Sequence, residues 1–376
     1  MITRHKIFYK SASNLQEIED SSVSLVITSP PYPMIEMWDE VFSQQNEDIK
    51  KALQNQDGRH AFELMHALLD SVWDEMDRVL VPGGIICINI GDATRTINNQ
   101  FQLYPSHSRV IQHFQGKGYH SLPEILWRKQ TNAPNKFMGS GMLPPGAYVT
   151  LEHEFILLFR KGGKREIADS TEKGLRKESA FFWEERNNWF SDIWDFKGIT
   201  QTMENGESRK RSAAFPFELA YRLINMFSLK EETILDPFLG TGTSMLAAMA
   251  SCRNSIGVEI DKSLEKIIGE RLKSAITFSN EYIENRLKAH VDFVNNRLKN
   301  NKEMKYMNQF FKVPVMTGQE TELKIFFLKS IKKVSEVEFE VEYDTNSPRG
   351  NTDVIQSGLY SYLQKPQRNK GLFEWV

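Results

Sequence analysis

Two short apolar runs, each ending in an unusual loop motif, constrain the fold of this chain more than any other feature. The first run, Val23 to Ile27, leads into Ser29-Pro30-Pro31-Tyr32. The second, Thr233 to Leu235, leads into Asp236-Pro237-Phe238-Leu239-Gly240-Thr241-Gly242-Thr243. Short apolar runs bounded by turn residues are typical of buried strands. Because adjacent prolines cannot continue a helix and glycines permit tight turns, both motifs are predicted to form loops at strand ends.

The rest of the chain alternates between predicted helices and strands. The helices cover Phe62 to Leu80, Ser108 to Gly116, Phe217 to Phe227, Thr243 to Ala250 and Lys262 to about Asn300. The further strands cover Ile85 to Ile90, Ile125 to Trp127, Phe155 to Phe159, Ser255 to Glu259 and Val334 to Tyr343. This alternation predicts an α/β core. The polar start, Met1 to Lys10, is assigned no element and has no apolar stretch typical of a signal peptide.

Composition restricts the class of protein. The chain has 376 residues, 40% of them hydrophobic, and a formal net charge of −2, so any attraction to nucleic acid must come from local patches. Its two cysteines, Cys87 and Cys252, lie in apolar stretches without partners at metal spacing. We expect reduced core thiols in a cytoplasmic protein, with no metal site and no membrane segment.

The glycine loop predicts a nucleoside site. Gly240 and Gly242 allow a ligand to approach the backbone closely, but the full Gly-x-Gly-x-x-Gly pattern for a dinucleotide pyrophosphate is absent. Asp236 leads the loop as an acceptor for an ammonium or amide group. Glu259 closes the next strand, where a carboxylate can accept from ribose hydroxyls. This combination favours S-adenosylmethionine, a nucleoside with an amino-acid tail and no phosphate.

The Ser-Pro-Pro-Tyr motif predicts chemistry on an exocyclic amine. The amine of a base is a poor nucleophile, so a site that methylates it must hold its N–H groups with acceptors. The Ser29 hydroxyl and the Pro30 carbonyl are candidate acceptors, and Pro30 and Pro31 stiffen the loop that carries them. Tyr32 is expected to offer a flat face to a flipped base and a hydroxyl at the rim of the site.

These motifs, in this order, resemble those of the amino-group DNA methyltransferases of restriction–modification systems, in the permuted β group. Thr28 to Tyr32 resembles the catalytic motif in the version usual for enzymes that form N4-methylcytosine, and Phe238 to Gly242 resembles the cofactor motif. The resemblance covers residues 7 to 275. It implies a Rossmann-like fold with a mixed, mostly parallel sheet, S-adenosylmethionine, duplex DNA with a flipped base, and a partner restriction endonuclease. The monomer and the homodimer both stay open.

The resemblance also implies a set of site residues. The catalytic residues would be Ser29, Pro30, Pro31 and Tyr32. The cofactor-binding residues would be Thr28, Ser212, Phe215, Asp236, Phe238, Gly240, Gly242, Thr243 and Glu259.

Three positions depart from the family pattern. Arg211-Ser212 stand where His-Pro is frequent, and Lys10-Ser11 stand where Gly-Asp is frequent, which leaves Ser11 as the cofactor candidate there. Asn89 stands where some relatives carry an acid, so a proton-accepting role there is unsupported. Asp92 is then the nearest carboxylate along the sequence.

The segment from Thr131 to Arg211 is predicted to read DNA. It carries aromatic residues that look exposed: Phe181, Phe182, Trp183, Trp189, Phe190 and Trp194. The candidate DNA-binding residues are Lys129, Arg186, Arg209, Lys210 and Arg211, because Arg pairs with guanine edges and basic runs suit phosphates. For any one of them, an ordinary surface charge is the alternative.

The resulting domain prediction has four parts. Residues 1–130 form the catalytic half of the core, and residues 131–211 the target-recognition region with a returning core strand near 153–160. Residues 212–278 form the cofactor half, and residues 279–376 a C-terminal extension. From Arg286 to Lys333 the chain holds eleven Lys and Arg against four Asp and Glu. That excess suits either a phosphate-binding arm or a solvated helix face.

The leading hypothesis from sequence is a site-specific cytosine-N4 DNA methyltransferase that protects host DNA. Methylation of adenine N6 by the same fold is the first alternative, and Ser29 favours cytosine. A DNA-binding module without catalysis and an RNA or protein amine methyltransferase are the others.

Overall fold

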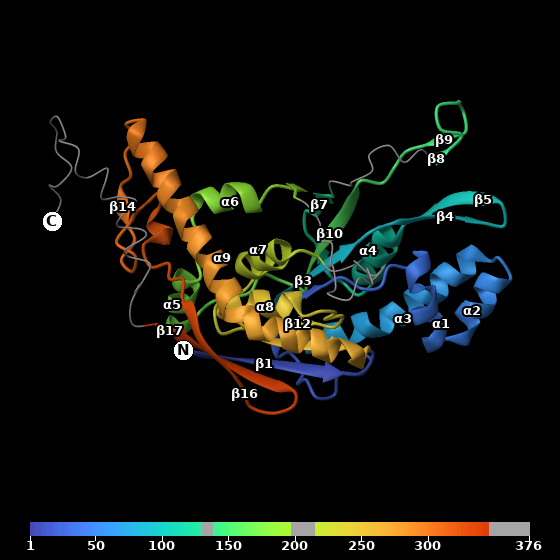
Figure 1. The fold of residues 1–376 in the computed structure, drawn as a ribbon, viewed down its shortest axis with the longest axis horizontal. Helices are drawn as coiled ribbons and strands as arrows, with labels where there is room; N and C mark the ends of the chain where they lie inside the picture. Colours follow the sequence, from blue (N-terminus) through green and yellow to red (C-terminus); the bar gives the residue numbers. More distant parts are fainter. Residues whose placement is uncertain (130–137, 197–214, 346–376) are drawn as a thin grey trace.

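A mixed sheet of eleven strands forms the centre of the computed structural model, which describes residues 1–129, 138–196 and 215–345 (Figure 1). In sheet order the strands are β11 (Ile193–Asp195), β7 (Ile125–Arg128), β10 (His153–Arg160), β3 (Leu80–Ile90), β2 (Val23–Thr28), β12 (Thr233–Asp236), β13 (Asn254–Glu259), β1 (Ile2–Tyr9), β17 (Glu338–Asp344) and β16 (Phe327–Lys333), with β6 (His120–Ser121) paired to β10.

The five central strands, from β3 to β1, run parallel, whereas β10 and β17 join them antiparallel on either side. Strands β2 and β12 are neighbours in the sheet. After β2 the chain continues to β3 on one side of this pair, and after β12 it continues to β13 on the other side. The crevice between such a pair of strands, at their carboxyl ends, is where open α/β sheets bind ligands. The predicted Rossmann-like, mostly parallel fold is confirmed.

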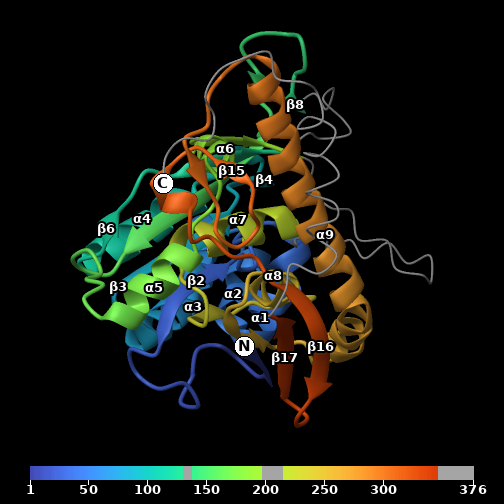
Figure 2. The same ribbon diagram turned by 90° about the vertical axis from the view of Figure 1, so that its left-hand side faces the viewer.

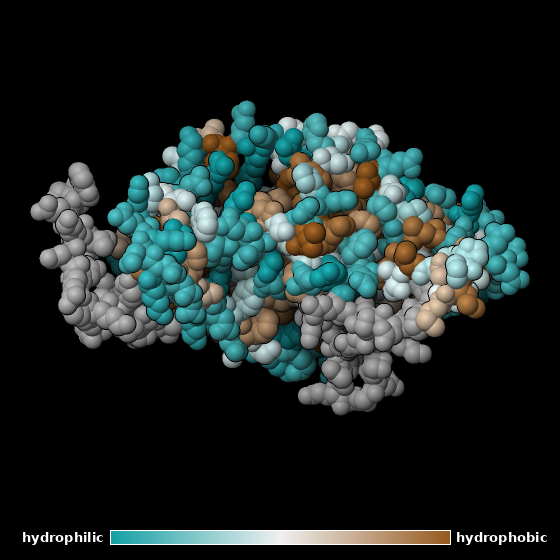
Figure 3. Space-filling view, turned by 90° about the horizontal axis from the view of Figure 1, so that it is seen from above, coloured by the Kyte–Doolittle hydropathy of each residue, from teal (hydrophilic) through white to brown (hydrophobic). Residues whose placement is uncertain are grey.

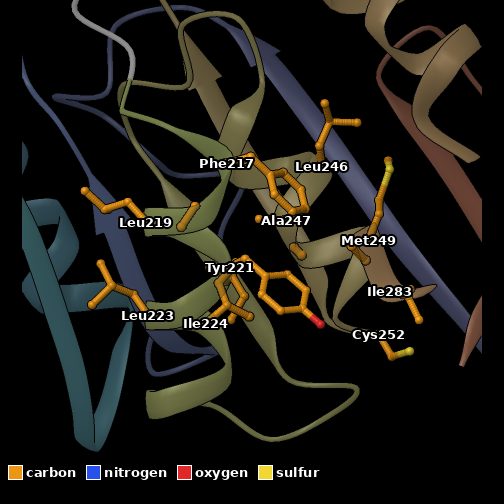
Figure 4. Close-up of a cluster of buried hydrophobic side chains, with 14 of the residues drawn as sticks. Phe217, Leu219, Tyr221, Leu223, Ile224, Leu246, Ala247, Met249, Cys252 and Ile283 are labelled. Atoms are coloured by element: carbon orange, nitrogen blue, oxygen red, sulfur yellow. The ribbon is translucent and has the colours of Figure 1, made fainter. Parts of the chain in front are cut away.

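Helices cover both faces of this sheet. They are α1 (Asp39–Gln45), α2 (Glu47–Gln54), α3 (Gly58–Val79), α4 (Ser106–Gly116), α5 (Ser170–Glu178), α6 (Trp183–Trp189), α7 (Phe217–Phe227), α8 (Thr243–Ala250) and α9 (Glu265–Lys299). Side chains of α3 and α4 form one core with alternate residues of β2 and β3, and α7, α8 and α9 form a second core on the other face. Figure 4 shows the second core, where Phe217 and Tyr221 of α7 lie beside Leu246 and Met249 of α8.

In the part of the chain that the structure describes, three small hairpins lie outside the main sheet. They are β4 (Ala93–Ile97) with β5 (Gln100–Tyr104), β8 (Met138–Gly139) with β9 (Ala147–Tyr148), and β14 (Tyr306–Met307) with β15 (Pro314–Val315). The first two project from the same side of the molecule (Figure 1). The rings of Phe101 and Tyr148 stack between them at a centroid distance of 4.3 Å.

Most predicted elements are confirmed, and α7 and α8 begin and end at the predicted residues. The polar start is the main omission, because it forms β1 between β13 and β17. Its inward positions Thr3 and His5 are fully buried but polar, and His5 is bonded to Thr3 and Ser255 at 2.8 Å each. Hydrogen-bonded polar side chains replaced the apolar alternation that would have marked this strand.

The tail contributes to the same sheet. The strand predicted from Val334 to Tyr343 begins later, at Glu338, and the residues before it form the turn from β16 (Figure 2). Helix α9 runs unbroken through the position of the boundary predicted between residues 278 and 279. The tail therefore shares its longest helix with the cofactor half of the core.

Several aromatic residues expected on the surface are instead buried, which corrects that part of the prediction. Phe182, Trp189 and Trp194 are at most 5% exposed. The Phe182 ring stacks on His290 of α9 at 3.7 Å, and Arg286 of α9 donates to Glu185 and to the Tyr221 hydroxyl at 2.8 Å each. Arg286, one of the basic residues of the tail, thus packs α6 against α9. Within the described ranges, no helix has the length and apolarity needed to cross a bilayer.

Replacing Tyr343 by Phe should destabilise the protein. The buried Tyr343 hydroxyl donates to the Met249 carbonyl at 2.7 Å and lies 2.8 Å from the Thr3 hydroxyl, so it joins the tail to α8 and β1. Loss of the hydroxyl leaves the Met249 carbonyl and the Thr3 hydroxyl buried with one hydrogen bond fewer each. We therefore expect the free energy of unfolding to fall by about 1–3 kcal/mol in urea denaturation. Tyr306→Phe, at a 45% exposed position, is the control. Equal unfolding midpoints for the two variants would show that the hydroxyl does not stabilise the fold.

Candidate active site

The two loop motifs, two hundred residues apart in sequence, meet at the carboxyl ends of β2 and β12. A cavity of about 170 Å³ lies between them. Its lining includes eight of the predicted residues: Ser29, Pro31, Phe215, Asp236, Phe238, Gly240, Thr243 and Glu259. Ser11 also lines it, whereas sequence reasoning missed Trp38, Phe42, Leu69 and Asp261. Asp261 follows Glu259 closely. The other missed residues come from the segment after Tyr32, and no sequence motif in that segment indicates a binding role.

Asp236 is the buried polar centre of this crevice, with only 3% of its surface exposed. One carboxylate oxygen accepts from the Thr28 hydroxyl at 2.8 Å and from the Phe238 N–H at 3.1 Å, and the other accepts from the Ser244 hydroxyl at 2.5 Å. Burial raises the pKa of Asp236 to about 6 despite these donors. Thr28 is fully buried and does not line the cavity, so its role is to hold the Asp236 carboxylate by this hydrogen bond.

The glycine loop is built on left-handed backbone. Gly240 has φ +57° and Gly242, which precedes α8, has φ +84°, conformations that L side chains rarely adopt. The Glu259 carboxylate spans the loop, accepting from the Gly240 N–H at 2.7 Å and from the Asp261 N–H at 2.8 Å. Burial raises the pKa of Glu259. Two buried carboxylates therefore sit at one cavity, a setting suited to a ligand with hydroxyl or cationic groups.

The Ser-Pro-Pro-Tyr motif forms a polar cluster next to this cavity. The Tyr32 hydroxyl donates to Glu154 at 2.8 Å, accepts from the Asn89 amide at 2.8 Å, and lies 3.1 Å from the Ser29 hydroxyl. We expected this hydroxyl at the rim, but Tyr32 is only 8% exposed and its hydroxyl points inward. Burial and the Glu154 carboxylate raise the pKa of Tyr32 well above its ordinary range, so the phenol stays protonated.

The carboxylate of this cluster is Glu154, which corrects the expectation for Asp92. Asp92 instead accepts from His107, through the ring nitrogen Nδ1 at 2.7 Å and the backbone N–H at 3.1 Å. Glu154 lies on β10, whose register places Phe155 opposite Ile90 and thereby brings Glu154 beside Asn89. Strand pairing between residues 65 positions apart creates this contact, and no local sequence signal announces it.

Asn89 completes the cluster from β3. Its Nδ2 group donates to Glu154 at 2.7 Å as well as to Tyr32, while its Oδ1 atom is buried without a hydrogen-bond partner among the residues described. The carboxylate requires the NH₂ group on its side, so this amide orientation follows from the chemistry. A buried acceptor without a donor marks a place where a ligand N–H would complete the hydrogen bonding.

The predicted DNA-binding residues are scattered. Lys129 lies at the active-site edge, where its ammonium pairs with Glu154. Arg186 lines a different cleft together with Ser24 and Gly84, at the amino ends of β2 and β3 and therefore at the opposite edge of the sheet. This placement argues against a role for Arg186 at the target base. Arg209, Lys210, Arg211 and Ser212 lie outside the described residues.

Thr28→Val should destabilise the protein in a pH-dependent way. A carboxyl group whose pKa is raised on folding favours the folded state while it is protonated, and this contribution is lost as the pH rises through about 6. Losing the Thr28 donor makes the ionised form costlier still. Urea denaturation should show a loss of about 1–3 kcal/mol at pH 8 and a smaller loss at pH 5. The control is Thr96→Val on the exposed hairpin β4–β5; a pH-independent loss would contradict the argument.

Comparison with known proteins agrees with this geometry. The model of the N6/N4 DNA methylase family matches residues 23–270. The type II methyltransferase M.MthZI of Methanothermobacter thermautotrophicus is 50% identical over 351 residues, which cover 93% of this chain and 98% of that protein. M.MjaI of Methanocaldococcus jannaschii is 52% identical over 281 residues, 72% of this chain and 91% of that protein.

A solved structure shares the fold as well. TTHA0409 of Thermus thermophilus, described as a candidate DNA modification methylase, was solved in complex with S-adenosyl-L-methionine. It superposes with a TM-score of 0.54 at 30% identity, covering 72% of this chain and 95% of that one. The family match, a relative that aligns over nearly its whole length and the two meeting motifs lead to one conclusion. The chain belongs to the N6/N4 amino-group DNA methylase family, among the type II methyltransferases.

Proposed function

We propose that this protein transfers a methyl group from S-adenosylmethionine to the N4 amine of cytosine within a specific sequence of duplex DNA. The observation that carries the proposal is Ser29 at the boundary between the cavity that holds Asp236 and Glu259 and the polar cluster around Tyr32. Such methylation would protect host DNA, in the cytoplasm, from a partner restriction endonuclease. The M.MthZI and M.MjaI relatives support the type II context.

The cavity residues fit S-adenosylmethionine. The left-handed glycine loop lets a ligand approach the backbone closely, and Phe215 and Phe238 supply apolar walls for an adenine ring. Asp236 and Glu259 are placed to accept from the cationic amino-acid tail and the ribose hydroxyls. When bound, S-adenosylmethionine supplies a methyl group on a positively charged sulfur. No phosphate-binding arrangement is needed, in agreement with the incomplete dinucleotide pattern.

The Ser29 loop would hold the amine. Its hydroxyl and the Pro30 carbonyl accept N–H groups, so that the nitrogen lone pair points toward the cofactor cavity. Pro31 lines that cavity, and the adjacent prolines fix the loop before the base arrives. Buried acceptors of this kind contribute most as the nitrogen loses its conjugation with the ring.

DNA must reach the edge of the sheet at which β2 ends. The chain leaves β7 and re-enters β10 at this same edge, next to Lys129 and Glu154. Met142 and Leu143, in the turn of the β8–β9 hairpin, are 84% and 71% exposed. Elsewhere, as seen from above, apolar residues form small patches on a mostly hydrophilic face (Figure 3). The exposed apolar side chains of this hairpin are therefore candidates for contact with DNA bases.

Analysis of the methylated base separates cytosine from adenine. We expect nucleosides from DNA incubated with the protein and S-adenosylmethionine to contain N4-methylcytosine, because Ser29 stands where the adenine enzymes that the chain resembles usually carry Asp or Asn. Mass spectrometry of the digested DNA is the measurement. N6-methyladenine as the sole product would replace the cytosine proposal with its adenine alternative, which uses the same amine site.

Ser29→Ala and Asp236→Asn should have opposite kinetic signatures. Ser29→Ala should lower the single-turnover rate by about 100-fold or more while cofactor affinity persists, because the hydroxyl acts on the amine in the transition state. Asp236→Asn should weaken cofactor binding by about tenfold or more, because a charged acceptor is lost. Titration calorimetry and rapid quench measure the two effects. Ser335→Ala, at an exposed turn, is the control; equal losses of cofactor affinity in both test variants would refute the division of roles.

A further inference from the structure

A continuous hydrogen-bonded chain leads from the amine site into the protein. The Ser29 hydroxyl lies 3.1 Å from the Tyr32 hydroxyl, and the Tyr32 hydroxyl donates to Glu154 Oε2 at 2.8 Å. Since the Tyr32 proton is directed at the carboxylate, the Ser29 proton is the one shared between the two hydroxyls. The Ser29 oxygen then has a lone pair free to accept from an incoming N–H group.

Amine methylation creates a proton that must leave. The nitrogen lone pair forms the new N–C bond while the S–C bond breaks and its electron pair stays on sulfur. The nitrogen, now positively charged, has to release one N–H proton. The Ser29 hydroxyl and the Pro30 carbonyl can hold that proton by a hydrogen bond, but neither neutral group is basic enough to keep it at neutral pH.

We propose that Glu154 is the final acceptor of this proton, through Ser29 and Tyr32. The inference rests on the amine site of the proposed function, whether the amine belongs to cytosine or to adenine. The proton moves from nitrogen to Ser29 Oγ, the Ser29 proton to Tyr32 Oη, and the Tyr32 proton to Glu154 Oε2. Glu154 does not touch the base, so it acts through the two hydroxyls as a positioning and proton-accepting residue.

The surroundings of Glu154 suit this role. The charged and titratable groups that face it within the described ranges are Lys129 from the end of β7 and Tyr32 from the loop after β2. His153 precedes it on β10, where its ring packs against Phe155. Asn89 donates to the acceptor oxygen and to Tyr32, which holds the relay in line.

The charge of the site is conserved by the relay. Before transfer the site contains the positive sulfur, the positive Lys129 and the negative Glu154. After transfer the sulfur and Glu154 are both neutral and Lys129 keeps its charge. Because the negative charge is neutralised as the positive charge disappears, the buried site gains no net charge during the reaction. Lys129, which is also a candidate for DNA contact, forms the ion pair with Glu154.

Glu154→Gln tests the proposal, with Glu152→Gln as the matched control at an exposed position two residues earlier. Single-turnover methyl transfer at saturating cofactor should slow by about 100-fold or more in Glu154→Gln, as is typical for loss of a proton acceptor. The ratio of wild-type to variant rate should fall toward one in acid, because protonated Glu154 cannot accept the proton. The use of a ratio cancels the titration of Asp236, which both proteins share.

Measurements without turnover separate this role from a structural one. Cofactor affinity by calorimetry, DNA affinity, and the fluorescence of pyrrolo-cytosine at the target position should match the wild type, since the Gln amide oxygen can still accept from Tyr32. Tyr32→Phe, which cuts the same chain at another point, should show the same pH-dependent rate ratio. A ratio that stays constant with pH in both variants would overturn the relay. Failure of the wild type to methylate any base amine would instead overturn the proposed function.

Discussion

The hydrogen bond from Thr28 to Asp236 is the contact on which the site depends. It joins the last residue of β2 to the last residue of β12, the two strands at which the chain turns in opposite directions. It adds a side-chain contact to the backbone pairing of β2 with β12, which places the Ser-Pro-Pro-Tyr loop beside the glycine loop. A buried carboxylate needs donors, and Thr28, Ser244 and the Phe238 N–H supply them from both halves. Burial of the Asp236 carboxylate thus depends on donors from both motifs.

Three carboxylates of the site, those of Asp236, Glu259 and Glu154, lie in different environments. Asp236 and Glu259 are held by hydroxyl and backbone N–H donors and have no salt-bridge partner within the described residues. Glu154 is paired with Lys129 and bonded to Tyr32 and Asn89. Unpaired anions attract a cationic or hydroxyl-bearing ligand, whereas a paired anion that faces a phenol is suited to receiving a proton. The surroundings of each carboxylate, rather than its residue type, decide whether it suits binding a ligand or accepting a proton.

Prediction from sequence succeeded where local pattern and packing agree. Helices α7 and α8 begin and end at the residues predicted from their apolar runs, and both loop motifs were placed at strand ends as predicted. It failed where tertiary partners replaced the expected signal. Strand β1 was missed because its buried residues Thr3 and His5 are polar. The aromatic residues around α6 were expected on the surface but are covered by α9, a helix that begins about eighty residues later.

The sequence by itself determined the motifs of the candidate site: a Ser-Pro-Pro-Tyr loop, a glycine loop with two carboxylates, and their order along the chain. These features depend on residue type and on strand–loop–helix succession, which are local properties. Only the tertiary structure decided that Glu154, not Asp92, contacts the Tyr32 hydroxyl and that Arg186 faces the opposite edge of the sheet. The physical reason is that strand order and register, set by packing between distant segments, determine which polar side chains share a buried site.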